Sequence, residues 1–274
     1  MDERRRRTWA ALELGPVWRL RAPAGVAAPA GVPMPAGFPA APEVPAVAGV
    51  AGVAGVAGFV ADRAPAGDAP PSDPDGRAAR IAQLPWPGLV DAVAGCTACG
   101  LCASRRSTVF GVGPVPADWV LVGEAPGEQE DLRGEPFVGP AGRLLDAMLS
   151  AIGVRRDRDA FIANVLKCRP PRNRDPAPEE VSRCEPFLVR QIELLQPRLI
   201  VVLGRFAAQS LLRTDASIAA LRGRVHRYSA AGRELPLVVT YHPAYLLRSL
   251  PDKSKAWADL RLARRSFDAL GASQ

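Results

Sequence analysis

Residues 118–126 read DWVLVGEAP, a short run of mostly branched apolar side chains that stops at a glycine and a charged corner. This pattern is typical of a strand that is buried on both faces, as in a parallel sheet. Three other segments have the same form and also end at a polar or Gly/Pro corner: residues 161–168 (FIANVLKC), 198–204 (RLIVVLG) and 235–243 (LPLVVTYHP). We therefore predict a central, mostly parallel sheet of four strands.

Segments with the features of helices lie between and after these strands. They span residues 142–154, 177–196, 206–212 and 253–271. Strands that alternate with helices predict a three-layer α/β/α fold with helices on both faces of the sheet. Ligands of such folds gather at the carboxyl ends of the strands, so the corners after the strands are where we expect functional residues.

The chain before residue 77 has a different composition. We expect a short helical segment over residues 1–21 and a disordered linker over 22–76, where near-repeats of Pro, Ala, Gly and Val cannot bury a face. Residues 44–61 are long enough to raise the question of a membrane span, but they contain no Leu or Ile and we expect none. The globular domain is predicted over residues 77–272.

The formal net charge of +7 indicates a partner that carries negative charge, with nucleic acid the first candidate and an acidic membrane surface the second. The five cysteines are an odd number and include two C-x2-C spacings within residues 96–102, CTACGLC. This pattern suits ligation of a metal or cluster in a reducing compartment better than a secreted disulfide framework. We therefore expect a cytoplasmic protein.

The two remaining cysteines, Cys168 and Cys184, complete a set of four thiols with one C-x2-C pair. Four thiolates can hold zinc or an iron–sulfur cluster. Zinc ribbons usually close with a second C-x2-C pair, so the wide spacing between Cys168 and Cys184 favours a cluster. Spacing alone leaves open whether the pair is Cys96 with Cys99 or Cys99 with Cys102.

The corner after the first strand, residues 123–142, is rich in glycine, proline and carboxylates. A glycine-rich backbone lets amide N–H groups approach an anionic or carbonyl oxygen closely, and the alternative is a solvated acidic loop. The corner matches neither a Walker A loop nor a dinucleotide-binding fingerprint. Phe137 lies between two Gly/Pro turns. An aromatic ring at such a place either stacks on or covers a ligand, or it packs in the core.

The second corner follows Asn164. An asparagine in an apolar strand needs hydrogen-bond partners for both the oxygen and the nitrogen of its amide. These two groups can recognise a ligand ring that has a donor beside an acceptor. The alternative is that neighbouring backbone groups satisfy the amide. Four cations are crowded after it, next to a cysteine: Lys167, Arg169, Arg172 and Arg174. This crowding suits phosphate contacts better than a solvated face.

The third corner contains His242, one of two histidines. It directly follows a strand and precedes a proline, which places it either to face a ligand or to cap a helix. The other histidine, His226, lies among arginines with no apolar strand beside it, and we expect it on the surface.

These motifs, taken in order, resemble one family. The order is C-x2-C-x-L, VFGVG, GEAPGEQED, PFVGPAGRLLD, NVLKCRPPRNRDP, a distant second cysteine and HPAYLLR. It resembles the type four uracil-DNA glycosylases, the iron–sulfur branch of the uracil-DNA glycosylase superfamily, over residues 84–262. Several motifs in the right order with the right gaps are far more specific than any one of them.

The resemblance implies a [4Fe–4S] cluster that braces loops and does no redox chemistry in the reaction. In the family the second ligand cysteine is followed two residues later by leucine and then by an arginine, which here fits Cys99, Leu101 and Arg105. The ligands implied in this way are Cys96, Cys99, Cys168 and Cys184, and Cys102 becomes a bystander.

The resemblance also implies an enzyme of base excision repair that flips uracil out of DNA and hydrolyses its N-glycosidic bond, leaving an abasic site. Phe137 is expected to stack on the uracil, Asn164 to read its O4 and N3–H, and His242 to donate to its O2. The backbone of the GEAPG loop is expected to help hold the developing negative charge; its substrate-binding positions are Gly123, Ala125 and Gly127.

Further roles follow from the same resemblance. Ala125 stands where some members of the superfamily have an aspartate that positions water, so we nominate Glu124 for water positioning or cation stabilisation. Leu247 and Arg248 are candidates for the wedge that fills the gap left by the flipped base. The DNA contacts otherwise expected are Lys167, Arg169 and Arg172. The segment CRPPRNRDP contains no histidine, so we expect turnover and no covalent trapping.

Two alternatives compete with the enzyme. One is a non-catalytic DNA-binding module of the same superfamily, such as a domain that accompanies phage polymerases; the other is a zinc-bound nucleic-acid protein. The joint presence of Phe137, Asn164 and His242 favours the enzyme. We expect a monomer that acts on single- or double-stranded uracil-containing DNA, with the N-terminal extension as a candidate contact for a repair or replication partner.

Overall fold

The computed structural model describes residues 76–271. The helical segment expected over residues 1–21, nearly all of the expected linker and the candidate span at 44–61 lie outside the described residues. Among residues 76–271 no helix is both long enough and apolar enough to cross a bilayer.

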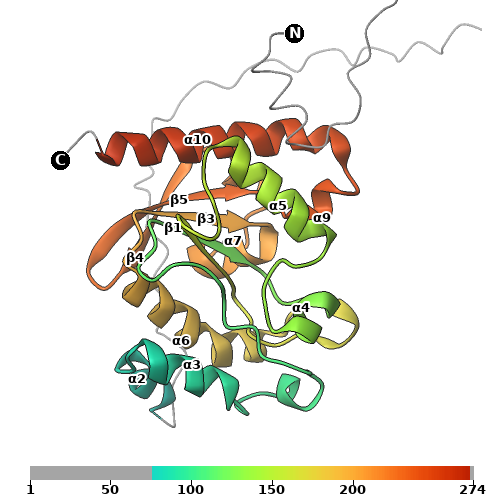
Figure 1. Ribbon diagram of the computed structural model, residues 1–274, viewed down its shortest axis with the longest axis vertical. Coiled ribbons are helices and arrows are strands. Elements are labelled where there is room, and N and C mark those ends of the chain that lie inside the picture. The colour runs from blue at the N-terminus through green and yellow to red at the C-terminus, as the bar shows by residue number, and fades with distance from the viewer. Residues whose placement is uncertain (1–75, 272–274) are drawn as a thin grey trace, which may run out of the picture. The chain divides into compact units, whose positions relative to one another are not determined.

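The centre of the fold is a five-stranded sheet with the order β2-β1-β3-β5-β4 (Figure 1). Strands β1, β2, β3 and β5 are parallel and are the four strands predicted. Their bounds are β1 Trp119–Gly123, β2 Ala160–Asn164, β3 Leu199–Leu203 and β5 Arg233–Thr240.

The prediction of four strands is wrong by one, because β4, Val225–Ala230, pairs antiparallel with β5 at the edge of the sheet. Its sequence VHRYSA is largely exposed and polar, so it lacks the apolar run that marks the other strands. His226 is therefore part of a strand. It is half-buried, and its Nε2 lies 2.6 Å from the carbonyl oxygen of Leu221, so the expectation of a surface histidine away from any strand is also wrong.

Helices cover both faces of the sheet, as the alternation of strands and helices predicts (Figure 1). Residues of β1 alternate between the faces: Trp119 and Leu121 pack with helices α5 and α10, whereas Val120 and Val122 pack with α6 and α7. The bounds of these helices are α5 Pro140–Ala151, α6 Pro178–Leu195, α7 Arg205–Leu212 and α10 Lys253–Gly271.

A smaller third core lies outside the sheet, beside the cysteines. Its apolar residues include Ile81, Leu89 and Val93 from the N-terminal helices and Phe187 from α6. The short elements of the described chain are α2 Arg77–Ala82, α3 Trp86–Ala94, α4 Glu128–Arg133, α8 Ile218–Leu221 and α9 Pro243–Leu246, with 3-10 turns η1 Gly100–Ala103, η2 Pro171–Asn173 and η3 Leu250–Asp252.

The first turn of α5 packs directly on the backbone of the preceding corner. A Cβ atom at Gly142 would lie 1.7 Å from the carbonyl oxygen of Phe137, so no other residue fits at this position without a shift of the backbone. Because Gly142 has no side chain, the first turn of α5 can pack directly against the corner, which fixes the position of one relative to the other.

We predict that Gly142→Ala lowers the free energy of unfolding by about 1–3 kcal/mol, because the added methyl group overpacks a site closed by backbone atoms. Gly88→Ala is the matched control: Gly88 is also helical, the nearest atom to its added Cβ would be 3.6 Å away, and the change should be neutral or slightly stabilising. Thermal unfolding followed by circular dichroism measures both. Equal shifts of Tm in the two variants would contradict the packing argument.

Candidate active site

A pocket opens at the carboxyl ends of the parallel strands, where the sequence predicts it. It brings together residues from three corners that are far apart in the chain. Its lining residues are Glu124, Ala125, Pro126, Gly127, Glu130, Phe137, Ala141, Asn164, Pro170, Asn173, Arg174, His242, Ala244, Tyr245 and Arg248.

Phe137 forms one wall of this pocket. Its side chain belongs to the core around α5, with 6% of the residue exposed, so it is both a core residue and a pocket residue. Its ring centroid lies 5.5 Å from that of His242, with the two planes tilted by 30°. Its backbone has φ = 54°, a left-handed conformation that bulky residues rarely adopt.

Asn164 ends β2 and is 2% exposed. Its Oδ1 has no hydrogen-bond partner among the described residues. Because buried polar atoms are normally paired, this oxygen is suited to accept a hydrogen bond from an N–H group of a ligand. A Cβ at Gly123 would lie 2.3 Å from Asn164 Oδ1 and 2.8 Å from Phe137 Cζ, so the glycine that ends β1 makes room for both side chains.

His242 both caps a helix and lines the pocket, which unites the two alternatives left open by its sequence position. Its Nδ1 accepts a hydrogen bond from the backbone N–H of Ala244 at 3.1 Å. In a neutral ring the proton must therefore be on Nε2, which makes that nitrogen a donor. Burial, with a smaller contribution from Arg248, lowers the pKa of His242 to about 4.

The GEAPG corner joins β1 to the pocket. The carbonyl groups of Gly123 and Glu124 accept hydrogen bonds from Val165 and Leu166 at 2.9 Å and 3.0 Å, which continues the pairing of β1 with β2. The Glu124 side chain lines the pocket, and its pKa is raised by burial and by Asp175, although Arg205 opposes the shift. Gly127, the N-cap of α4, also lines the pocket.

Glu130 is a site residue to which the sequence reasoning gave no role. Its Oε1 accepts hydrogen bonds from the backbone N–H groups of Val138 and Gly139 at 3.0 Å and 3.2 Å. The carboxylate therefore holds the turn that follows Phe137. A carboxylate in a glycine-rich corner is the only sequence signal for this contact, and it does not distinguish Glu130 from its acidic neighbours.

The segment after His242 presents exposed side chains on a braced loop. Leu247 is 38% exposed and Arg248 is also exposed, so both side chains face solvent. Asp252 closes the loop: its Oδ2 accepts from the hydroxyl groups of Tyr245 and Ser249 at 2.6 Å and 2.9 Å. The ion pair with Lys255, together with these two bonds, lowers the pKa of Asp252 to about 2.

The structure contradicts the prediction that Lys167 contacts DNA. Lys167 is 1% exposed, and its Nζ donates to the carbonyl oxygen of Asn164 at 2.8 Å and to Gln191 Oε1 at 2.6 Å. Burial lowers the pKa of Lys167 to about 8. The ammonium group is therefore directed into the protein and away from any phosphate.

The other cations of this corner differ in their accessibility. Arg172 is exposed in the 3-10 turn η2 with φ = 55°. Arg169 is half-buried and its Nε donates to Asn173 Oδ1 at 2.8 Å. Arg174 is bound by both carboxylate oxygens of Glu180, at 2.9 Å and 2.5 Å. Of these three arginines, Arg172 is thus the best placed to meet a phosphate.

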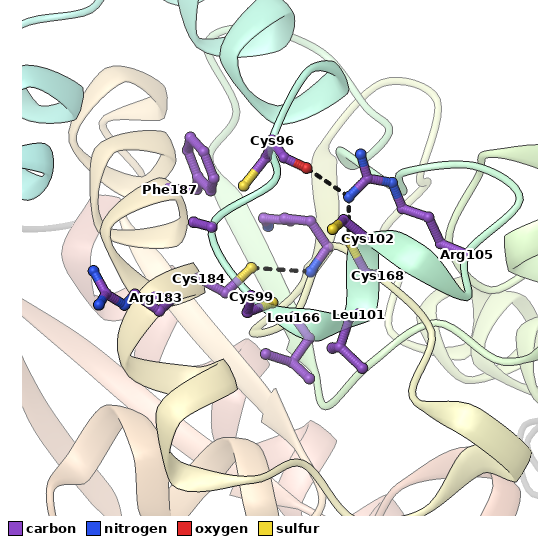
Figure 2. Close-up of a pocket in the computed structure, with 12 residues that line it drawn as sticks. Cys96, Cys99, Leu101, Cys102, Arg105, Leu166, Cys168, Arg183, Cys184 and Phe187 are labelled. Atoms are coloured by element: carbon purple, nitrogen blue, oxygen red, sulfur yellow. Dashed lines mark hydrogen bonds between the residues drawn. The ribbon is translucent and has the colours of Figure 1, made fainter.

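All five cysteines surround a second pocket (Figure 2). Arg105 crosses its edge: Nη1 donates to the carbonyl oxygen of Cys96 at 2.7 Å and to Cys168 Sγ at 3.3 Å. The backbone N–H of Lys167 donates to Cys184 Sγ at 3.2 Å. Burial raises the pKa of the Cys184 thiol to about 12 and also raises that of Cys168.

The residues around this second pocket fit a thiolate-bound cluster. Its lining contains five thiols, two arginines and one lysine, with no carboxylate or imidazole among them. Soft thiolate donors select zinc or iron–sulfur clusters, and the cations and N–H donors balance the negative charge of deprotonated sulfur. Across residues 76–270, no group of three or more Cys, His, Asp or Glu side chains could hold a single metal ion directly.

The chain belongs to the uracil-DNA glycosylase superfamily, because the model of that family matches residues 110–261. It is 48% identical over 163 residues to a type-4 uracil-DNA glycosylase of Archaeoglobus fulgidus, an alignment that covers 58% of this chain and 81% of the relative. It is 42% identical over 178 residues to a type-4 uracil-DNA glycosylase of Pyrobaculum aerophilum, with 64% and 90% covered. These findings confirm the family suggested by the sequence motifs.

A more distant similarity bears on the non-catalytic alternative. A DNA polymerase of Bacillus phage SP01 is 29% identical over 139 residues, which cover 50% of this chain but only 14% of the polymerase. The higher identity and coverage of the type-4 relatives favour the glycosylase over the polymerase-associated module.

We predict that the His242 ring stays neutral, with its proton on Nε2, at every pH above about 5, because burial opposes the charged form. A titration of the imidazole nitrogen shifts by NMR, assigned with His242→Gln, measures this. Uptake of a proton near the ordinary pKa of 6.5 would contradict it.

Since the His242 ring takes up its proton at a higher pH in the unfolded chain than in the folded protein, its contribution to the free energy of unfolding should fall as the pH decreases from 6.5 to about 4.

Proposed function

We propose that the protein is a monofunctional DNA repair glycosylase that flips uracil out of DNA and hydrolyses its N-glycosidic bond, leaving an abasic site. The observation that carries this proposal is the convergence of Phe137, Asn164 and His242, from three corners of the chain, on one pocket. The relatives named type-4 uracil-DNA glycosylases support it. We assign the glycosylase domain to residues 77–272.

Base recognition would rest on Asn164 and Phe137. The unpaired Oδ1 of Asn164 suits the N3–H of uracil, and the amide NH2 group then suits uracil O4. Cytosine carries no proton on N3, so it would leave the buried Oδ1 unpaired and facing a lone pair, which costs binding free energy. The ring of Phe137 would stack on the base.

His242 would act on the bond that breaks. Cleavage of the N-glycosidic bond leaves negative charge on the uracil, some of it at O2, and positive charge on the sugar. A donor fixed in advance at O2 stabilises the transition state where the charge appears. The Nε2–H group of a neutral ring, held by the Ala244 N–H on its other nitrogen, supplies such a donor.

Glu124 is our candidate for water positioning or for stabilisation of the sugar cation. Its carboxyl group lines the pocket from the first corner, next to Ala125. The backbone of the same corner, from Gly123 to Gly127, would contact the base, and its N–H groups would face developing negative charge.

DNA would be held by cations and by the braced loop. Arg172 and Arg169 would contact phosphates, which gives a salt-dependent affinity for single- or double-stranded DNA. Leu247 and Arg248 would fill the gap left by the extruded base. We propose a cytoplasmic monomer, with the N-terminal extension as a contact for a repair or replication partner.

Cys96, Cys99, Cys168 and Cys184 would hold a [4Fe–4S] cluster. When bound, the cluster would supply a structural cross-link between the segment after α3, the loop after β2 and helix α6, with no redox role in the reaction. The loop after β2 directly follows Asn164, so the cross-link would support the residue that reads the base.

The enzyme claim is tested with an oligonucleotide that carries one labelled uracil, treated with alkali after reaction. Cluster-loaded wild type should release uracil, and Asn164→Ala and His242→Ala should each lose about 100-fold or more of the rate, since each removes a group aimed at the base. His226→Ala changes the other histidine, outside the pocket, and should keep the rate. Wild type that binds the DNA but releases no uracil would replace the enzyme with the binding module.

The ligand set is tested by iron content and visible absorption. We expect brown wild type with about four iron atoms per chain. Cys102→Ala should keep the colour and the iron, whereas Cys96→Ala and Cys184→Ala should lose them. Loss of iron from Cys102→Ala with retention in Cys96→Ala would assign the C-x2-C pair to Cys99 and Cys102. A colourless, zinc-loaded wild type would exclude the cluster.

A further inference from the structure

Arg156 lies in the turn that leads from α5 to β2 and contacts the backbone of Phe137. Its side chain is only 20% exposed. Its Nη2 donates to the carbonyl oxygen of Phe137 at 3.1 Å, and its Nε forms an ion pair with Asp146 Oδ1 of α5 at 2.7 Å. Glu135 Oε1 lies 4.0 Å from its Nη1. The guanidinium group therefore joins the Phe137 backbone to a helix of the core.

The backbone that Arg156 holds needs an external restraint. Phe137 has φ = 54°, and a bulky residue in the left-handed region relaxes to another conformation unless its surroundings prevent it. Arg156 binds the carbonyl group of the peptide that follows Phe137, and Glu130 binds the next two N–H groups. Charged side chains thus hold both sides of the turn.

The position of the Phe137 ring depends closely on this turn. The ring lies against the backbone of Gly123, where an added Cβ would be only 2.8 Å from Cζ, and 5.5 Å from the ring centroid of His242. If Phe137 left the left-handed region, the direction of its Cα–Cβ bond would change and the ring would move toward one of these neighbours or into the space for the base. Small displacements of a group that contacts the substrate can change rates greatly.

We propose that Arg156 is a positioning residue for base recognition, which acts by holding the Phe137 carbonyl so that the ring presents its face to the flipped base. This inference rests on the proposed function, since it needs a base that stacks on Phe137. A guanidinium group suits the task because it can form an ion pair with the Asp146 carboxylate while its Nη2 donates to the Phe137 carbonyl oxygen, whereas a lysine ammonium group is a single point of charge.

The test is a double-mutant cycle on the full chain loaded with its cluster, with a single-stranded uracil oligonucleotide as substrate so that no duplex has to be opened. Arg156→Met should lower kcat/KM by about 10- to 100-fold in the wild-type background. In the Phe137→Leu background it should lower kcat/KM by less than about 3-fold, because the ring that Arg156 positions is already absent. Arg156→Lys should give an intermediate loss.

Arg190→Met is the matched control. Arg190 is 21% exposed, its Nε donates to the Leu84 carbonyl oxygen at 2.9 Å and its Nη1 pairs with Glu193 at 3.0 Å, which reproduces the environment of Arg156 outside the pocket. Its loss should lower Tm to a similar extent as Arg156→Met and leave kcat/KM within about 2-fold. Iron content and Tm are measured for every variant.

The outcomes separate this inference from the proposed function. Wild type that releases no uracil refutes the proposed function itself. An active wild type with equal losses from Arg156→Met in both backgrounds, or with losses matched by Arg190→Met, overturns the positioning role. If Arg156→Met fails to fold, Arg156→Lys decides: wild-type kcat/KM in a folded Arg156→Lys overturns the inference, and a loss that disappears in the Phe137→Leu background supports it.

Discussion

The pocket depends on the close packing of two side chains against a residue that has none. Gly123 ends β1 beside Asn164, its partner in the register of β2, and both Asn164 and Phe137 occupy the space that a side chain at residue 123 would fill. An alanine methyl would come within 2.3 Å of Asn164 Oδ1, well inside contact distance. The strand end, the amide and the aromatic ring can therefore adopt only a few arrangements, and the other pocket residues are built around them.

The second constraint connects the cysteines to this arrangement through one short segment. Lys167 donates its backbone N–H to Cys184 Sγ and its ammonium group to the carbonyl oxygen of Asn164. Gln191, which accepts from the same ammonium group, donates in turn to the carbonyl oxygen of Phe110. A buried cation is favourable only where such acceptors satisfy it, so the end of β2, helix α6 and the segment at Phe110 are fixed together.

Much of this arrangement follows from the sequence, because the carboxyl ends of parallel strands meet at one edge of a sheet. That rule places Asn164 and His242 in one pocket before any coordinates are known. It does not find β4, whose exposed polar residues conceal its pairing with β5. A sequence shows the charge of Lys167 but not its burial, and it shows Phe137 but not the left-handed backbone, since both arise from contacts between distant segments. The choice between Cys96 and Cys102 likewise required the family pattern.

The loop closed by Asp252 has a thermodynamic consequence. Tyr245, Leu247 and Leu250 are 37%, 38% and 52% exposed, an unusual density of accessible apolar side chains for six consecutive residues. Segments that become ordered when they meet a partner lose conformational entropy at that moment, which weakens association. Here the hydroxyl groups of Tyr245 and Ser249 already share one carboxylate in the free protein. The loop therefore loses its conformational entropy when the protein folds. A partner that contacts its apolar surface would then bind at little further entropic cost.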